Sequence, residues 1–222
     1  HIVIKKNTKI GEGNRIFQFS SIGEDPADKK FSGEETWLEI GDQNIFREGV
    51  TAHRGTRSGG GITKIGSTNL LMPYVHIAHD CFIGNNCIFS NNSTLAGHIT
   101  IGDFVILAGL VAVHQFSTIG DHAFVAGGSL VRKDVPPYVK AAREPLSYVG
   151  INSVGLRRRG FSLEKITEIQ NIYRILYQKK FNNSQAADII EAEMVASPER
   201  DEILQFIRNS QRGVMKGYFQ KN

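Results

Sequence analysis

Residues 83–101 read IGNNCIFSNNSTLAGHITI, with branched or aromatic apolar residues at positions 83, 89, 95 and 101. This six-residue spacing fits neither the 3.6-residue period of a helix nor the alternation of a hairpin strand. It is typical of a parallel β-helix, in which each hexapeptide forms one short strand and a turn, and three hexapeptides close a triangular coil. We therefore expect sixth-position side chains to fill the interior and glycine to supply the special backbone angles at the corners. Residues 18 apart should stack, about 4.8 Å from one another.

The same period extends outward in both directions. It is unbroken from Ile65 to Val131, and it appears earlier at Ile4, Ile10, Ile16 and Ile22. Residues 24–37 and 57–61 interrupt it, so both segments should loop out of the prism. Long loops inside a regular solenoid are commonly functional.

The period stops at Val135-Pro136-Pro137, because two prolines break strand pairing. Apolar residues after Ser162 then recur at helical spacing, which predicts a helix that begins there. Further helices are expected from 183 or 184 and from Pro198. The chain is thus predicted to be mainly β: a β-helix over residues 1–145, then a small α-helical C-terminal domain over residues 146–222.

The start of the chain and its composition restrict the kind of protein that we expect. The chain begins at His1, already inside the repeat, so we expect further N-terminal coils to be missing from it. No apolar run approaches the ~20 residues of a membrane span, so none is expected. Cys81 and Cys87 are six apart and fall on adjacent faces, which argues against a disulfide and agrees with a reducing cytoplasm.

Positive charge is concentrated in the C-terminal part. Residues 151–222 hold 12 Lys and Arg against 8 Asp and Glu, whereas residues 1–150 hold 14 of each. The whole net charge of +4 therefore lies in the predicted helical domain. An excess of this kind favours an acidic partner or a phosphate-bearing ligand.

Six of the seven histidines lie between positions 53 and 122, and four of them fall on one predicted edge of the prism. Adding 18 to His79 gives Gly97, which adjoins His98. His114 lies 16 residues beyond His98, and His53 lies about one coil before His79 once the glycine-rich insertion is removed. A column of histidines suits either metal ligation by three imidazoles or general-base catalysis by one of them.

The residues around His79 favour the second chemistry. Asp80 is adjacent and can fix the tautomer of the imidazole. Gly97 lies one coil away, where a backbone N–H unobstructed by a side chain could stabilise an oxyanion beside the base.

At this point the sequence resembles the UDP-N-acetylglucosamine O-acyltransferases of lipid A biosynthesis. The resemblance covers nearly the whole chain, and its most specific element is Gly155-Leu156-Arg157-Arg158-Arg159-Gly160-Phe161-Ser162 before a helical tail. Four other stretches support it: HIAHDC at 76–81, LAGH at 95–98, AVHQF at 112–116 and DVPPY at 134–138.

The resemblance implies a left-handed β-helix, an exception to the usual right-handed crossover. It also implies a cytoplasmic homotrimer with active sites between neighbouring subunits. The reaction would move a 3-hydroxyacyl chain from the phosphopantetheine of acyl carrier protein to the glucosamine 3-hydroxyl of UDP-GlcNAc, the first step of lipid A synthesis. No metal, further cofactor or nucleic-acid partner is implied.

The family's functional positions carry over residue by residue. His79 matches the general base and the backbone N–H of Gly97 the oxyanion donor, and Asp80, beside His79, is expected to orient it. Sugar-binding positions correspond to Asp28, Lys30, His76, His98 and Gln115, and His53 matches a histidine near the acyl or pantetheine path. His114 is also expected to bind substrate. The residues that hold the UDP end correspond to Asn152, Arg158 and Arg159, since guanidinium groups suit a pyrophosphate.

Two positions depart from the family pattern, and a third is expected to influence the length of the acyl chain. Val154 stands where an acid is common, which puts a ribose or uracil contact in doubt, and Ala27 replaces a polar residue beside Asp28. Gly127 falls where the family sets acyl-chain length, and its missing side chain favours a long chain, although depth also depends on neighbours such as Phe124. The sequence leaves the acyl length open, and also the choice between a 3-hydroxyl and a 3-amino acceptor.

The sequence leaves three alternative functions open. A γ-class carbonic anhydrase shares the fold and binds metal through three histidines, but His122 is poorly spaced from His114 for the third ligand. A sister UDP-glucosamine N-acyltransferase would not need the arginine-rich stretch at 157–159. A non-catalytic scaffold would leave the histidine column unexplained.

Overall fold

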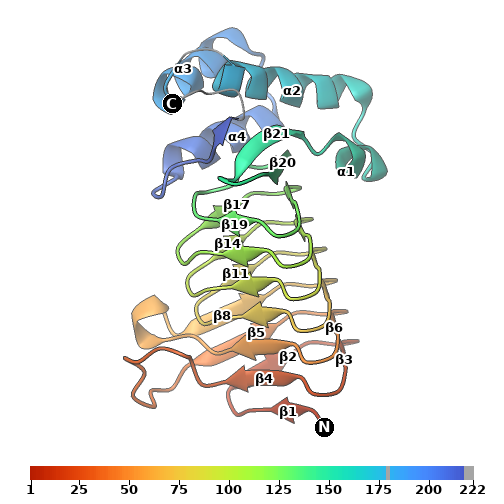
Figure 1. Cartoon of the computed structure of the whole chain (residues 1–222), viewed down its shortest axis with the longest axis vertical. Helices are drawn as coiled ribbons and strands as arrows, with labels where there is room; N and C mark the ends of the chain where they lie inside the picture. Colours follow the sequence, from red (N-terminus) through yellow and green to blue (C-terminus); the bar gives the residue numbers. More distant parts are fainter. Residues whose placement is uncertain (179–180, 218–222) are drawn as a thin grey trace.

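The computed structural model describes residues 1–178 and 181–217. It forms the predicted left-handed parallel β-helix, whose coils stack along the long axis of the molecule and end beneath a group of helices (Figure 1). We call the three faces of the prism sheets A, B and C.

Each face is a sheet of short parallel strands contributed by every third hexapeptide. Sheet A contains β1 (Val3–Ile4), β4 (Ser21–Glu24), β7 (Thr51–His53), β10 (His76–Ile77), β13 (Thr94–Leu95), β16 (Ala112–Val113) and β19 (Leu130–Val131). Sheet B contains β2 (Thr8–Ile10), β5 (Trp37–Ile40), β8 (Ile62–Ile65), β11 (Phe82–Ile83), β14 (Thr100–Ile101) and β17 (Thr118–Ile119). Sheet C contains β3 (Arg15–Ile16), β6 (Ile45–Phe46), β9 (Leu70–Leu71), β12 (Ile88–Phe89), β15 (Ile106–Leu107), β18 (Phe124–Val125), β20 (Val139–Ala142), β21 (Ser147–Ile151) and β22 (Lys216–Gly217).

The register confirms that residues 18 apart stack. Leu95 of β13 pairs with Ile77 of β10 on one side and with Val113 of β16 on the other. Every sixth residue from Ile65 to Val131 is buried, and together these side chains form the continuous core of the prism. The hydrophobic period therefore determines which side chains face inward, and so which face outward at the corners.

The prediction for glycine at the corners holds at only some of them, such as Gly13 (67°), Gly49 (67°) and Gly128 (70°). At most corners the φ angles in the left-handed region belong to non-glycine residues such as Asn86 (57°), Phe104 (58°) and His122 (58°). Gly66 and Gly84, which follow inward isoleucines, are needed for space instead. A Cβ on Gly66 would lie 2.5 Å from the carbonyl oxygen of Gly84, and one on Gly84 would lie 2.7 Å from the carbonyl carbon of Gly102. Glycine here lets successive coils approach closely.

Both predicted insertions leave the prism. The first joins β4 to β5 and is anchored where the buried guanidinium of Arg54 meets the carboxylate of Asp25. The second joins β7 to β8 and contains one turn of 3-10 helix, η1 (Arg57–Gly59).

The helical domain begins with an element that the periodicity did not reveal, α1 (Ser153–Arg158). It is followed by α2 (Leu163–Gln178), α3 (Asn183–Glu193) and α4 (Pro198–Asn209), which begin at or within one residue of their predicted starts. Ser197 caps α4, and its hydroxyl accepts from the Arg200 N–H at 3.1 Å. The boundary at 145 stays a prediction; β20 and β21 form an antiparallel pair across it. None of the described helices is long and apolar enough to cross a bilayer.

Candidate active site

The predicted base lies at the edge where sheet A turns into sheet B. His79, Gly97 and Gln115 each lie two residues after the end of β10, β13 and β16, so the three residues occupy the same position in three successive coils. We call this the A/B edge, defined by residues 78–80, 96–98 and 114–116. The 18-residue stacking that the sequence predicted therefore brings His79 beside Gly97.

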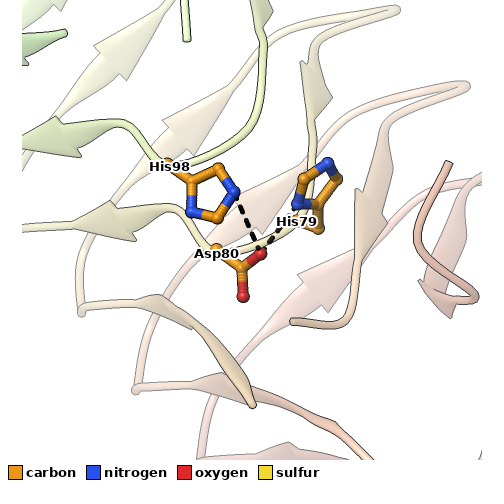
Figure 2. A group of neighbouring side chains, drawn as sticks. All are labelled: His79, Asp80 and His98. Atoms are coloured by element: carbon orange, nitrogen blue, oxygen red, sulfur yellow. Dashed lines mark hydrogen bonds and ion pairs between the residues drawn. The ribbon is translucent and has the colours of Figure 1, made fainter. Parts of the chain in front are cut away.

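His79 and Asp80 form a hydrogen-bonded pair. The Nδ1 atom of His79 lies 2.8 Å from Oδ2 of Asp80, and the other ring nitrogen points away from the carboxylate (Figure 2). Because an ionised carboxylate only accepts, Nδ1 carries the proton in this bond, and Nε2 of a neutral ring is left with its lone pair. His98 approaches the same oxygen, with Nε2 at 3.6 Å. The pair therefore has the geometry of an oriented base.

The geometry also bears on the metal alternative. Donor atoms of His79, Asp80 and His98 lie within 4.8 Å of one another, which is close enough to share an ion. However, Nδ1 of His79 and Oδ2 of Asp80 are engaged in a hydrogen bond with each other. The third histidine of that alternative does not come to this edge within the chain: His122 is stacked on Phe104 and Tyr138, where sheet B turns into sheet C. The donor set fits a hydrogen-bonded dyad better than a ligand set.

Gly97 lies directly against the imidazole. A Cβ added to Gly97 would lie 2.5 Å from Cε1 and 2.9 Å from Nε2 of His79, so any side chain would displace the ring. The N–H of Gly97 has no hydrogen-bond partner among the described residues, and the same holds for His79 and Gln115 at this position of their coils. The fold thus leaves an N–H free in these three coils, and only at Gly97 does it adjoin both a bare Cα and the imidazole.

Two further histidines lie near the base, His76 on β10 of the same coil and His53 on β7 one coil toward the N-terminus. The rings of His53 and His76 are 4.9 Å apart in an edge-to-face arrangement, and Nδ1 of His76 lies 2.7 Å from the Thr51 hydroxyl. Burial lowers the pKa of both, that of His53 to about 4, so both rings are neutral at physiological pH. Nδ1 of His53 is buried without a partner among the described residues.

The upper part of the A/B edge is more open. The ring of His98 is stacked on Phe116 at 4.5 Å, whereas His114 and Gln115 are exposed. Nδ1 of His114 lies 3.1 Å from the carbonyl oxygen of its neighbour Gln115 and not against another histidine ring. His114 therefore joins the column less closely than the sequence predicted.

The residues predicted to hold the UDP end lie elsewhere, at the B/C edge. Asn152 caps α1 through its Oδ1 atom, and its amide donates to the carbonyl oxygen of His122 at 2.9 Å. Arg159 donates to the carbonyl oxygen of Phe104 at 3.0 Å and lies over that ring. Arg158 is exposed. Asn152 and Arg159 thus attach the helical domain to the prism, and Arg158 points into solvent.

The remaining predicted residues are separated from both groups. Asp28 accepts from the Lys30 N–H at 2.9 Å within the first insertion. Gly127 lies where sheet C turns back into sheet A, and a Cβ added there would make a tight contact, 3.1 Å from the carbonyl oxygen of Gly109. Val154 is 53% exposed on α1. A single chain therefore distributes the predicted site over three edges of the prism.

Sequence reasoning missed the residues that hold Asp80. The Thr56 N–H and hydroxyl each donate to the carboxylate at 2.7 Å, and the Asp80 N–H donates to the Thr63 hydroxyl at 2.7 Å. The only signal for Thr56 was its place at the start of an insertion that interrupts the period.

Comparisons with known proteins identify the family of the chain. Residues 134–215 match the family model "Udp N-acetylglucosamine O-acyltransferase; Domain 2", and residues 62–97 match that of the bacterial transferase hexapeptide. The chain is 48% identical, over 94% of its length and 81% of the relative's, to the acyl-[acyl-carrier-protein]–UDP-N-acetylglucosamine O-acyltransferase of Myxococcus xanthus. The chain belongs to the UDP-N-acetylglucosamine O-acyltransferase family.

Solved structures of the family superpose closely on the model. The UDP-N-acetylglucosamine acyltransferase from Bacteroides fragilis matches with a TM-score of 0.95 at 50% identity, over 97% of this chain and 84% of that one. The enzyme from Francisella novicida matches with a TM-score of 0.92 at 35% identity, over 98% and 93% of the two chains. Membership of the family confirms the resemblance read from the sequence and replaces the carbonic anhydrase, N-acyltransferase and scaffold alternatives.

Proposed function

We propose that this protein transfers a 3-hydroxyacyl chain from acyl carrier protein to the 3-hydroxyl of UDP-GlcNAc, with His79 as the general base. The observation that carries the proposal is the contact between Gly97 and His79. It places a free backbone N–H beside an imidazole whose Nδ1 is occupied by Asp80. A base and an oxyanion donor on one spot are what acyl transfer requires.

The chemistry follows from this arrangement. Nε2 of His79 accepts the proton of the sugar hydroxyl as its oxygen attacks the thioester carbonyl carbon, and the Gly97 N–H stabilises the negative charge on the carbonyl oxygen. The tetrahedral intermediate then expels the phosphopantetheine thiolate, which takes the proton from the His79 imidazolium. The products are the 3-O-acyl sugar nucleotide and the free carrier thiol. Asp80 holds the ring in the required tautomer throughout.

The acceptor should lie along the histidine column. His76 in the same coil and His53 one coil below are neutral and can accept or donate hydrogen bonds beside the base, and His98, His114 and Gln115 lie above it. Asp28 and Lys30 would approach the sugar from the first insertion. Because the His53 and His76 rings are neutral and Gln115 carries no charge, this part of the site suits a sugar and its amide better than a phosphate.

The UDP end requires the arginines, which lie on a different edge from His79. A homotrimer resolves this separation, since the B/C edge of one subunit can meet the A/B edge of the next. Phe116, at the A/B edge, is 53% exposed and supports such an interface. We therefore place Asn152, Arg158 and Arg159 at the pyrophosphate end of a site shared between subunits.

The remaining parts of the proposal concern the acyl donor, the cell compartment, the acyl length and the acceptor atom. The acyl chain arrives on the phosphopantetheine of acyl carrier protein, so no metal or other cofactor is needed, and the reaction is placed in the cytoplasm as the first step of lipid A synthesis. Gly127 is proposed to limit the acyl length, and its missing side chain favours a long chain. The acceptor atom is proposed to be the 3-hydroxyl.

The decisive assay presents UDP-GlcNAc, and separately its 3-amino analogue, with 3-hydroxyacyl carrier proteins of eight to eighteen carbons, and detects the acylated sugar by mass spectrometry. We expect transfer to UDP-GlcNAc with a preference for the longer chains. Absence of product with every donor would contradict the proposal, and transfer to the analogue alone would change the acceptor. Metal analysis of protein purified without chelator tests the expectation that no metal is bound.

A further inference from the structure

The glycine-rich insertion between β7 and β8 has no part in the reaction as proposed so far. It begins at Thr56, which is 3% exposed and caps the single 3-10 turn η1. The insertion leaves the prism one coil below His79, and Thr56 N–H lies 2.7 Å from Oδ1 of Asp80. It is therefore adjacent to the catalytic dyad although it is absent from the repeat pattern.

Thr56 and His79 share one carboxylate oxygen. The Thr56 hydroxyl lies 2.7 Å from Oδ2 of Asp80, and Nδ1 of His79 lies 2.8 Å from the same atom. Because the carboxylate accepts, the hydroxyl must donate to it. The lone pairs of the hydroxyl in turn accept from the Gly59 N–H at 3.2 Å. The direction of the Thr56 O–H bond is thus fixed by the turn.

The turn also covers the carboxylate. A Cβ added to Gly59 would overlap the Asp80 carboxylate group, so the Gly59 backbone packs directly on it. Gly59 has no φ in the left-handed region, and space is therefore the reason for a glycine there. As a result the Asp80 side chain is 1% exposed and is excluded from water.

We propose that Thr56 is a positioning residue of this enzyme: its hydroxyl fixes the Asp80 carboxylate, which in turn fixes the tautomer and direction of the His79 ring. The inference rests on the proposed function, because it assumes that His79 is the base. It makes the second insertion a part of the catalytic apparatus rather than a tolerated loop.

Two donors from one residue restrain the carboxylate, the Thr56 N–H at Oδ1 and its hydroxyl at Oδ2. Removing the hydroxyl leaves one restraint, so the carboxylate can rotate about the Cβ–Cγ bond and the ring can follow it. Thr56 is itself buried and does not touch the sugar path. Its loss should therefore lower kcat and leave the KM for UDP-GlcNAc unchanged.

The test compares Thr56→Val, which keeps the shape and the backbone N–H, with Thr56→Ser, which keeps the hydroxyl. With saturating 3-hydroxyacyl carrier protein we expect Thr56→Val to lower kcat about tenfold or more, with KM within twofold. Thr56→Ser should stay within threefold of wild type. Thr36→Val is the matched control, because Thr36 is also fully buried but its hydroxyl has no partner among the described residues. Wild-type kcat in Thr56→Val, or equal losses in the Val and Ser variants, would overturn the proposal.

Gly59→Ala provides a second route if Thr56→Val does not fold. It keeps every hydrogen-bonding group but forces the carboxylate to move, and should lower kcat with KM unchanged. Unaltered kcat in this variant would also count against the proposal.

The route through Asp80 is tested by combining substitutions. If Thr56 acts through the carboxylate, Thr56→Val should cause no further loss in an Asp80→Ala background, whereas additive losses would show an independent role. The proposed function and the proposed role of Thr56 can be refuted separately. A wild-type protein without transferase activity, or an active His79→Ala variant, refutes the proposed function. If His79→Ala is inactive, the Thr56 variants then decide the positioning role alone.

Discussion

The Gly97 backbone lies against the edge of the His79 ring, so that a Cβ on Gly97 would be 2.5 Å from Cε1 and 2.9 Å from Nε2. The two residues are 18 apart and occupy adjacent coils, whose spacing is fixed by the ladder between β10 and β13. The base and the proposed oxyanion donor are therefore held by the regular part of the fold and not by a loop. Such rigid support favours catalytic precision.

Gly97→Ala should lower kcat by ~10²–10³, because the methyl group displaces the ring and obstructs the oxyanion position. Gly109→Ala is the reference for stability, since a Cβ there meets only the Asn91 carbonyl oxygen at 3.6 Å. Melting temperatures and kcat should be measured for both variants. Normal turnover in Gly97→Ala would remove this N–H from the mechanism.

His79→Ala should abolish most of the activity without unfolding the protein. Loss of a general base costs ~10²–10⁴ in rate, whereas an imidazole at a prism corner contributes little to the hydrophobic core. The comparison requires kcat and the melting temperature of the same preparation. Activity within threefold of wild type would show that another group takes the proton.

The residues changed in these two variants were predicted from the sequence, whereas other residues of the site were not. The inward positions, the stacking of His79 on Gly97 and the helices from 163, 183 and 198 followed from periodicity and capping residues, because both are local signals. Thr56 could not be found in this way, since its partner Asp80 is 24 residues away and an insertion destroys the register between them. The left-handed angles at Phe104 and His122 were missed for another reason: most corners accept residues other than glycine, and the glycines that follow inward isoleucines are needed for close coil packing instead.

The UDP end should depend on Arg158 more than on its neighbour Arg157. Arg158 is exposed at the end of α1, and its pyrophosphate contacts would be similar in the ground and transition states. We expect Arg158→Ala to raise the KM for UDP-GlcNAc about tenfold or more with a small change in kcat. Arg157→Ala, in the same turn, is the control. An effect confined to kcat would contradict this role.

Arg159 should behave differently because it holds the helical domain on the prism. Its hydrogen bond to the Phe104 carbonyl oxygen and its position over that ring are lost in Arg159→Ala. We expect a lower melting temperature in addition to a raised KM, with a loss of about 1–3 kcal/mol in the free energy of unfolding. An unchanged melting temperature would show that the contact does not stabilise the domain junction.

Glu202 should make stability depend on pH. Burial on α4, beside the Tyr138 hydroxyl and near Asp121 and Glu199, raises its pKa from the usual 4.5 to about 7. Unfolding therefore releases a proton between about pH 4.5 and 7, so the contribution of this group to stability falls as pH rises through that window.

Glu202→Gln tests this sign, because the amide can still accept from Tyr138 but does not titrate. The melting temperature of the variant relative to wild type should rise from pH 5 to pH 8, and Glu193→Gln, at an exposed position, should show no such trend. The difference in melting temperature between variant and wild type is the quantity to use, because His53 and His122 also make stability depend on pH. Burial lowers their pKa values to about 4, so these two groups destabilise the fold as pH falls, the opposite trend to that of Glu202. A difference that is flat with pH would refute the assignment.

The acidic carrier protein should be steered by the basic C-terminal domain. Three of its twelve Lys and Arg residues, at 179, 180 and 221, lie outside the described residues, which leaves nine basic against eight acidic side chains in the part that the structure describes. Several of those nine are already paired, as Arg208 is with Glu191 and Lys165 with Glu199. The unbalanced charge is thus concentrated at the positions that include Lys179 and Lys180.

Reversing Lys179 and Lys180 to Glu should therefore raise the KM for acyl carrier protein, while the KM for UDP-GlcNAc remains nearly unchanged. The same KM should increase with salt in the wild type, because screening acts over a Debye length of about 8–10 Å. Arg208→Glu is the matched control, since Arg208 is already neutralised by Glu191 on the neighbouring helix. A donor KM that is insensitive both to salt and to the double reversal would show that this domain does not steer the carrier protein.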